Sequence, residues 1–218
     1  MNTDDLIRRF VVEAGPVRRL PPPWRRAGLW LAISLPCIGA VVLLMTPRPD
    51  LAERLADPRF QAEQLAAFAT AVLAAFAAFS AVVPGRTRRV LLLPLLPLVV
   101  WMASLGQDCF RILLSVGPDG LRLGWDPVCI PAIAIVGAVP AAAIVVMLRR
   151  GAPLQPGATL ALGGLAAAAL GNFGLRLFHT QDASLMVLVW QLGTVLLLAA
   201  LCGFMGRHVL KWRQMESA

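Results

Sequence analysis

Residues 65–83 read LAAFATAVLAAFAAFSAVV, an apolar run that is long enough to cross a lipid bilayer. The run contains no charged residue and no continuous polar face with which a water-facing helix would meet solvent. Five further apolar runs occur in the chain, at 27–45, 90–105, 128–148, 158–177 and 185–204. The pattern predicts an all-α integral membrane protein, built as a bundle of six transmembrane helices.

The segments outside these runs are short. Hydrophobic residues make up 58% of the 218 residues, more than is typical of a soluble globular domain. The length leaves no room for a separate soluble domain beside the bundle. We therefore divide the chain into an N-terminal tail at 1–26, a transmembrane domain at 27–206 and a C-terminal tail at 207–218.

Arg and Lys are distributed unevenly about the apolar runs. Fourteen of the twenty lie in the two tails and in the connectors that follow the second and fourth runs. Because Arg and Lys are enriched on the cytosolic side of membrane proteins, both termini are predicted to be cytosolic. The net charge of +8 then reflects membrane orientation, and the pattern does not favour direct binding to nucleic acid.

Motifs for common enzyme chemistry are absent from the sequence. It has no glycine-rich phosphate loop, no HExxH pair and no GxSxG turn. None of the six apolar runs contains an acidic residue of the kind that carries protons or ions across a membrane. These absences disfavour an enzyme, a bound cofactor, a pump and a proton-coupled carrier.

Small residues recur at helical spacing in two of the runs. They are Gly163, Ala167 and Gly171 in the fifth run, and Ala67, Ala71, Ala75 and Ala78 in the second. Such residues let helix backbones approach closely within a membrane. We expect a packing seam inside the bundle, with a homodimer face as the alternative. In the third run, Pro94 and Pro97 predict a kink.

Two polar residues, Asn172 and Gln191, lie inside apolar runs. The short connector between the fifth and sixth runs favours antiparallel packing, which would place both residues at the same depth. We expect a hydrogen bond between the two helices, with a ligand site as the alternative. Arg176, one turn beyond Asn172, is expected to extend outward to solvent, toward Asp182.

Cys109 and Cys129 flank the connector between the third and fourth runs, which is predicted to lie on the outer side. In an oxidising compartment, two such thiols can sense an oxidant or a soft metal, or form a static disulfide. Two unrelated cysteines without a role are the remaining alternative. His179 and Asp182 lie on the same side and would be able to complete a polar or metal site, for a metal that the sequence does not specify.

The N-terminal tail contains a segment that predicts a short amphipathic helix. Thr3 is a suitable N-cap, and Asp4 and Asp5 fall in the first turn, where the helix dipole favours acids. The apolar stripe consists of Leu6, Ile7, Phe10, Val11 and Ala14. So short a helix is marginal in water and needs a groove or a membrane surface to bury the stripe. The two acids favour a protein groove, because anionic lipid would repel them.

Four segments carry a family resemblance. They are MNTDDLI at 1–7, PPWRR at 22–26, DPVC at 126–129 and LRLFHTQDASLMVLVWQ at 175–191. Together they resemble the NrsF-type negative regulators of ECF sigma factors. The resemblance covers essentially the whole chain, and its most specific parts are the tail and the stretch 179–191.

The resemblance implies a multi-pass anti-sigma factor of the bacterial inner membrane, which is a regulator and not an enzyme. Its cytosolic N-terminal segment would hold an ECF sigma factor inactive. The candidate sigma contacts are Asp4, Asp5, Leu6, Ile7 and Phe10.

The resemblance also implies that a heavy metal or an oxidant on the outer side releases the sigma factor, with Cys129 as a sensing thiol. Relatives commonly carry a second thiol just after the histidine that precedes the sixth span. This chain has Thr180 at that position, so either Cys109 replaces the second thiol or the sensing chemistry differs.

A membrane thiol oxidoreductase that passes electrons to quinone is the alternative function. It would need two reactive thiol pairs or a CxxC motif, and the sequence has no CxxC.

Overall fold

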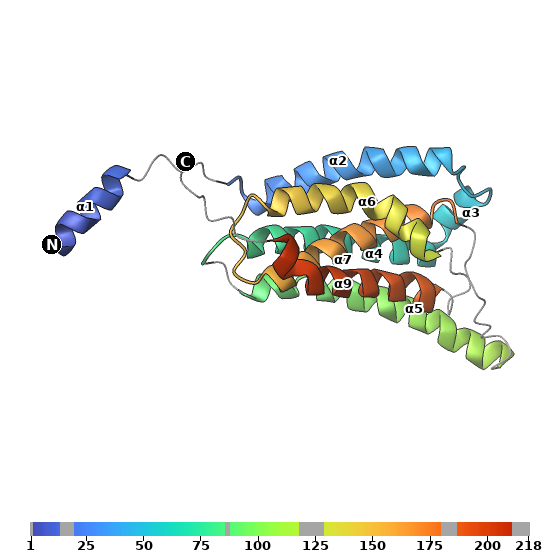
Figure 1. The fold of residues 1–218 in the computed structure, drawn as a ribbon. Helices are drawn as coiled ribbons and strands as arrows, with labels where there is room; N and C mark the ends of the chain where they lie inside the picture. The colour runs from blue at the N-terminus through green and yellow to red at the C-terminus, as the bar shows by residue number, and fades with distance from the viewer. Residues whose placement is uncertain (1, 14–19, 86–87, 118–128, 180–186, 211–218) are drawn as a thin grey trace.

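A computed structural model shows a helical chain whose described residues are 2–13, 20–85, 88–117, 129–179 and 187–210. Within these ranges no β-strand occurs. Six long helices form one elongated bundle (Figure 1). They are α2 (Pro23–Leu44), α4 (Pro58–Ala81), α5 (Leu95–Val116), α6 (Cys129–Leu148), α7 (Pro156–Leu175) and α9 (Gly193–Val209).

Shorter elements accompany the bundle. Helix α3 (Leu51–Ala56) and the 3-10 turn η1 (Arg88–Leu92) lie in connectors, and the π-helical turn η3 (Val187–Leu192) leads into α9. Helix α1 (Thr3–Glu13) is drawn away from the bundle in Figure 1 and has no buried residue.

All six bundle helices are long and apolar enough to cross a membrane. Helix α7, for example, has 20 residues, which rise by about 30 Å and match the hydrocarbon core of a bilayer. The expected six-span, all-α architecture is confirmed at this level. Since six consecutive spans alternate in direction, α2 begins and α9 ends at the same end of the bundle.

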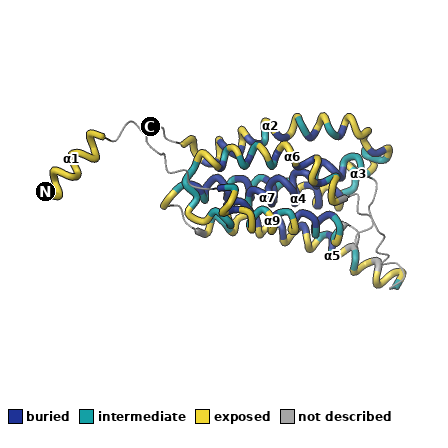
Figure 2. Tube along the Cα trace, in the orientation of Figure 1, coloured by how far each residue is buried: buried dark blue, intermediate teal, exposed yellow. Residues whose placement is uncertain are grey.

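Helices α4 and α7 occupy the centre of the bundle and are its most buried members (Figure 2). Large side chains are fully buried at this centre, including Phe79 of α4, Trp30 of α2 and Trp101 of α5. Trp30 of α2 also donates from its indole Nε1 to the backbone oxygen of Pro140 in α6, at 2.9 Å. The indole thus satisfies its one polar group inside the bundle.

The small residues that the sequence singles out form internal seams. A Cβ added at Gly171 would lie 2.9 Å from the backbone oxygen of Ile133 and 3.1 Å from the backbone nitrogen of Gly137, both in α6. The alanines of the second run are likewise fully buried in α4. The packing seam is confirmed. These small residues pack against other helices of the same chain and are not left for a homodimer face.

Helices α4 and α5 extend furthest beyond the predicted runs. Helix α4 begins at Pro58, where the Asp57 side chain caps it by accepting from the backbone N–H of Arg59 at 3.0 Å. Helix α5 continues to Val116 and ends at Gly117, whose φ of 79° favours glycine. The helix therefore includes Cys109, which the sequence places in a connector.

The third run is interrupted at its proline pair, where the 3-10 turn η1 gives way to α5. Pro94 is the N-cap residue of α5 and Pro97 lies in its first turn. The first N–H groups of a helix have no partner within the helix, so proline at this point removes no hydrogen bond.

Candidate functional site

Helix α1 carries the residues predicted to contact a partner. At the helical spacing of about 100° per residue, Leu6, Ile7 and Phe10 share one face, and Val12 lies on the opposite face. The side chain of Phe10 is 63% exposed, and all the other described residues of α1 are exposed as well. Asp4 and Asp5 occupy the first turn. The helix therefore presents an apolar stripe that the bundle does not cover.

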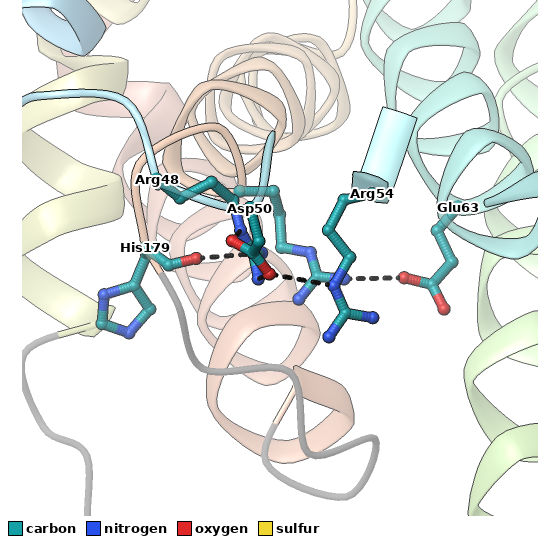
Figure 3. Close-up of polar contacts among 6 residues, drawn as sticks. Arg48, Asp50, Arg54, Glu63 and His179 are labelled. Carbon is teal, nitrogen blue, oxygen red and sulfur yellow. Dashed lines mark hydrogen bonds and ion pairs between the residues drawn. The ribbon is translucent and has the colours of Figure 1, made fainter. Parts of the chain in front are cut away.

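A network of charged side chains (Figure 3) lies around α3, at the end of the bundle opposite the start of α2 (Figure 1). Arg48 donates from Nε and Nη2 to the two carboxylate oxygens of Asp50, at 2.7 and 2.8 Å. Arg54 of α3 donates to the Oδ2 atom of Asp50 at 3.3 Å. The hydrogen bond from Arg48, supported by Arg54, lowers the pKa of the Asp50 carboxyl well below its ordinary value. Asp50 is thus ionised at neutral pH.

Arg48 also joins this connector to the end of α7. Its backbone N–H donates to the backbone oxygen of Leu177 at 3.1 Å. Its Nη1 atom donates to the backbone oxygen of His179 at 3.3 Å (Figure 3). Because Arg48 is buried and holds both segments, residues 48–50 and 177–179 are expected to move together.

A buried ion pair ties the same region to α4. The Nη2 atom of Arg176 lies 3.0 Å from Oε2 of Glu63, and the two side chains are only 6% and 10% exposed. The guanidinium also lies over the ring of Phe60, 5.2 Å from its centroid. We call Arg48, Asp50, Arg54, Glu63 and Arg176 the charged clamp.

The clamp corrects one expectation and qualifies another. Arg176 does not extend outward to solvent, because its side chain is buried against Glu63. Glu63 lies inside a span, since α4 begins before the predicted run. The span thus contains an acid that the predicted run left out, but this acid lies in the second turn of α4 and not at mid-span, and it is paired with an arginine.

The two polar residues of the fifth and sixth runs are both buried, each 1% exposed. Neither amide oxygen, Oδ1 of Asn172 or Oε1 of Gln191, accepts a hydrogen bond from the described part of the chain. The expected bond between the two side chains is therefore absent there. Instead, α7 is joined to α4 one residue further on, where Gln64 Nε2 donates to the backbone oxygen of Phe173 at 3.2 Å.

The sensing residues are placed only in part. Cys109 lies in the second half of α5 and is half-buried. Cys129 is the first residue of α6, but its side chain lies outside the described residues, as does Asp182. No group of three or more His, Cys, Asp or Glu that would hold a metal ion occurs among the residues that the structure describes. The thiol pair and the metal site therefore stay predictions.

The charged clamp positions backbone segments, as Arg48 does by holding the backbone at Leu177 and His179. His179 directly precedes the segment that contains Asp182, a candidate predicted from the sequence for the outer polar or metal site. Sequence reasoning missed four members of the clamp, which are Arg48, Asp50, Arg54 and Glu63. The sequence contains only a weak indication of these ion pairs. Charged residues of both signs lie near the same predicted membrane surface, but nothing in the sequence shows which of them pair.

Comparisons with known proteins complete the description. The profile of one family, described as "Negative regulator of sigma F" and called NrsF, matches residues 10–212. No curated protein and no solved structure matches the chain. The family match includes all six bundle helices but only the last four residues of α1. The chain therefore belongs to the NrsF family of negative regulators of sigma F.

Proposed function

We propose that this protein is an anti-sigma factor of the bacterial inner membrane, which holds an ECF sigma factor inactive through a cytosolic α1. One observation carries the proposal. In a chain of this regulator family, α1 presents an apolar stripe that the bundle leaves uncovered. The stripe fits the recognition mode in which an amphipathic helix lies in a hydrophobic groove of its partner.

The charges of α1 support a protein partner. Asp4 and Asp5 lie at the N-terminal end of the helix, where they stabilise it through the helix dipole. When the apolar stripe is buried in a groove, Asp4 lies beside Val11 at the rim and is able to meet a basic side chain of the partner, whereas Asp5 lies on the opposite face with Val12. Charge pairs at a rim guide association more than they add affinity.

This role is tested by co-purification from membranes of the native host under non-reducing conditions. We expect the sigma factor to accompany the full-length protein and to be lost when residues 2–13 are deleted. The bundle should be unaffected, because α1 has no buried residue. A sigma factor that still accompanies the deletion variant would place its binding site elsewhere in the chain.

We further propose that Cys109 and Cys129 sense the outer stimulus. Oxidation would join the two sulfur atoms, with transfer of two electrons to the oxidant and loss of the two thiol protons. A soft metal would instead bind the two thiolates. Either event changes the contacts between α5 and the start of α6. This change alters α1 only if the bundle has two discrete arrangements that bind the stimulus with different affinities.

Substituting Cys129→Ser is expected to abolish the response of a sigma-dependent reporter to both oxidant and metal. Serine keeps the size of the side chain but neither forms a disulfide nor binds a soft metal. Cys37→Ser is the matched control, because Cys37 lies within α2 and takes no part in the proposed pair. If the Cys129→Ser reporter still responds like the wild type, this thiol has no part in sensing.

A further inference from the structure

Among the described residues, one arginine is buried at the arginine-rich end of the bundle, where α2 begins and where α4 and α6 end. Arg26 lies in the first two turns of α2 and is only 4% exposed. Its guanidinium lies over the ring of Phe79 in α4, 4.5 Å from the ring centroid. Its Nη2 atom donates to the backbone oxygen of Met147 in α6. The charge is thus enclosed by three helices.

These contacts leave the arginine incompletely satisfied. Its Nη1 atom is buried and makes no hydrogen bond with any described group. A buried donor without a partner destabilises a fold, and a buried charge without a counter-charge does so more strongly. The aromatic ring and one carbonyl oxygen reduce this penalty, but neither supplies a negative charge.

The described residues of the bundle offer no carboxylate at this end. Among residues 20–210 that the structure describes, the acidic residues lie in the connectors and helix segments toward the other end. They are Asp50, Glu53, Asp57, Glu63 and Asp108. The nearby charge of Arg150, which follows α6, is also positive and acts unfavourably on Arg26. A counter-charge for Arg26 must therefore come from outside the bundle.

We propose that Arg26 and Arg150 form a phosphate-binding site for the headgroup of an anionic phospholipid. Both residues lie at the end of a membrane-spanning helix, the depth at which headgroup phosphates are concentrated. Basic pockets between spans on the positively charged side bind such headgroups. The N-terminus of α2 adds a favourable dipole, because the N-cap residue Pro22 provides no side-chain cap.

The geometry also indicates how the headgroup approaches. Nη1 of Arg26 is covered by protein atoms, whereas Arg150 is exposed. We expect the phosphate to enter from the side of Arg150, which swings outward and shares the anion with Arg26. One phosphate between the two guanidinium groups would accept charge-assisted hydrogen bonds from both and offset their mutual repulsion. The tail that carries α1 joins the bundle at this point, so a bound lipid would also fix where the tail emerges.

The experiment compares the full-length protein in nanodiscs of phosphatidylcholine with nanodiscs in which part of that lipid is replaced by phosphatidylglycerol. We expect the anionic lipid to raise the unfolding temperature of the wild type by about 2–4 °C. Arg26→Gln should lose this difference. Arg25→Gln, which removes an exposed charge from the neighbouring position, should keep it.

A second readout covers the case in which Arg26→Gln folds poorly. Arg150→Gln changes an exposed residue and leaves the packing of the bundle intact. In native mass spectrometry, retention of phosphatidylglycerol by this variant should fall by roughly tenfold relative to the wild type. Retention equal to that of the wild type would overturn the site.

Three other outcomes would also overturn the proposal. The lipid-dependent shift could persist in Arg26→Gln, which would show a general charge effect. Inorganic phosphate in phosphatidylcholine nanodiscs could produce the whole shift, which would show a site for free phosphate and not for lipid. Deleting residues 2–13 could abolish the shift, which would show that the anionic lipid acts on α1, with its basic Arg8 and Arg9, and not on Arg26.

Discussion

Replacing both Ile7 and Phe10 with aspartate is expected to release the sigma factor and turn its regulon on without a stimulus. Both side chains lie on the apolar stripe and are largely exposed in α1. Truncating one aromatic anchor of an interface commonly costs about 2 kcal/mol or more, and placing a charge in the groove adds a desolvation penalty. The affinity should fall by at least about thirtyfold, measured as the dissociation constant between the sigma factor and the protein in nanodiscs.

Val12→Asp is the matched control for this double variant. Val12 is also exposed, but it lies on the opposite face of α1, and its substitution introduces the same charge into the same short helix. We expect its dissociation constant to stay within about threefold of the wild type, as for a residue outside the centre of the interface. Equal losses from the two faces would show that α1 does not bind through its apolar stripe.

Arg176→Met is expected to lower the free energy of unfolding of the bundle by about 3–5 kcal/mol. The substitution leaves Glu63 buried and charged, because the side chain of Glu63 is only 10% exposed. It also removes the contact of the guanidinium with the ring of Phe60. The measurement is denaturant-induced unfolding of the purified protein in detergent micelles.

The control for this variant is the double substitution Glu63→Met with Arg176→Met. Replacing both partners of a buried pair with apolar residues of similar size is often neutral or stabilising, so the double variant should recover most of the lost stability. Arg54→Met, which breaks a half-exposed contact with Asp50, should cost at most about 1 kcal/mol. A double variant as unstable as Arg176→Met alone would mean that the pair is not the source of the effect.

The spans were predictable because the bilayer core offers the backbone no hydrogen-bonding partners. A helix must satisfy its own backbone, and a run such as 65–83 contains only residues that lipid or protein interior accepts. The small residues of α7 were also predictable as a seam. Their spacing is that of one helix face, and Gly171 meets backbone atoms of α6 at distances that no side chain would allow.

The ends of the helices were less predictable, and with them the charged clamp. The apolar pattern stops at residue 65, but Pro58 and the Asp57 cap start α4 two turns earlier. That extension carries Glu63 into the bundle and opposite Arg176. Which acid meets which arginine depends on the axial register of two helices, and periodicity along one sequence does not contain that information.

The polar residues inside the spans show the same limit. The sequence indicates that Asn172 and Gln191 are buried, and they are, but the direction of each amide depends on rotamers and on the π-helical turn η3 that includes Gln191. Arg26 is a similar case. Its neighbour Arg25 has the same charge, yet only Arg26 faces the helices that enclose it.

The central claim is that α1 occupies a groove of the sigma factor while the regulon is silent. It is tested most directly by placing a photo-activated cross-linking residue at position 10 or at position 12 in the native host and irradiating unstressed cells. The account predicts an adduct with the sigma factor from position 10 and little from position 12. If position 10 yields no adduct with the sigma factor in unstressed cells, whose regulon is silent, the central claim is contradicted.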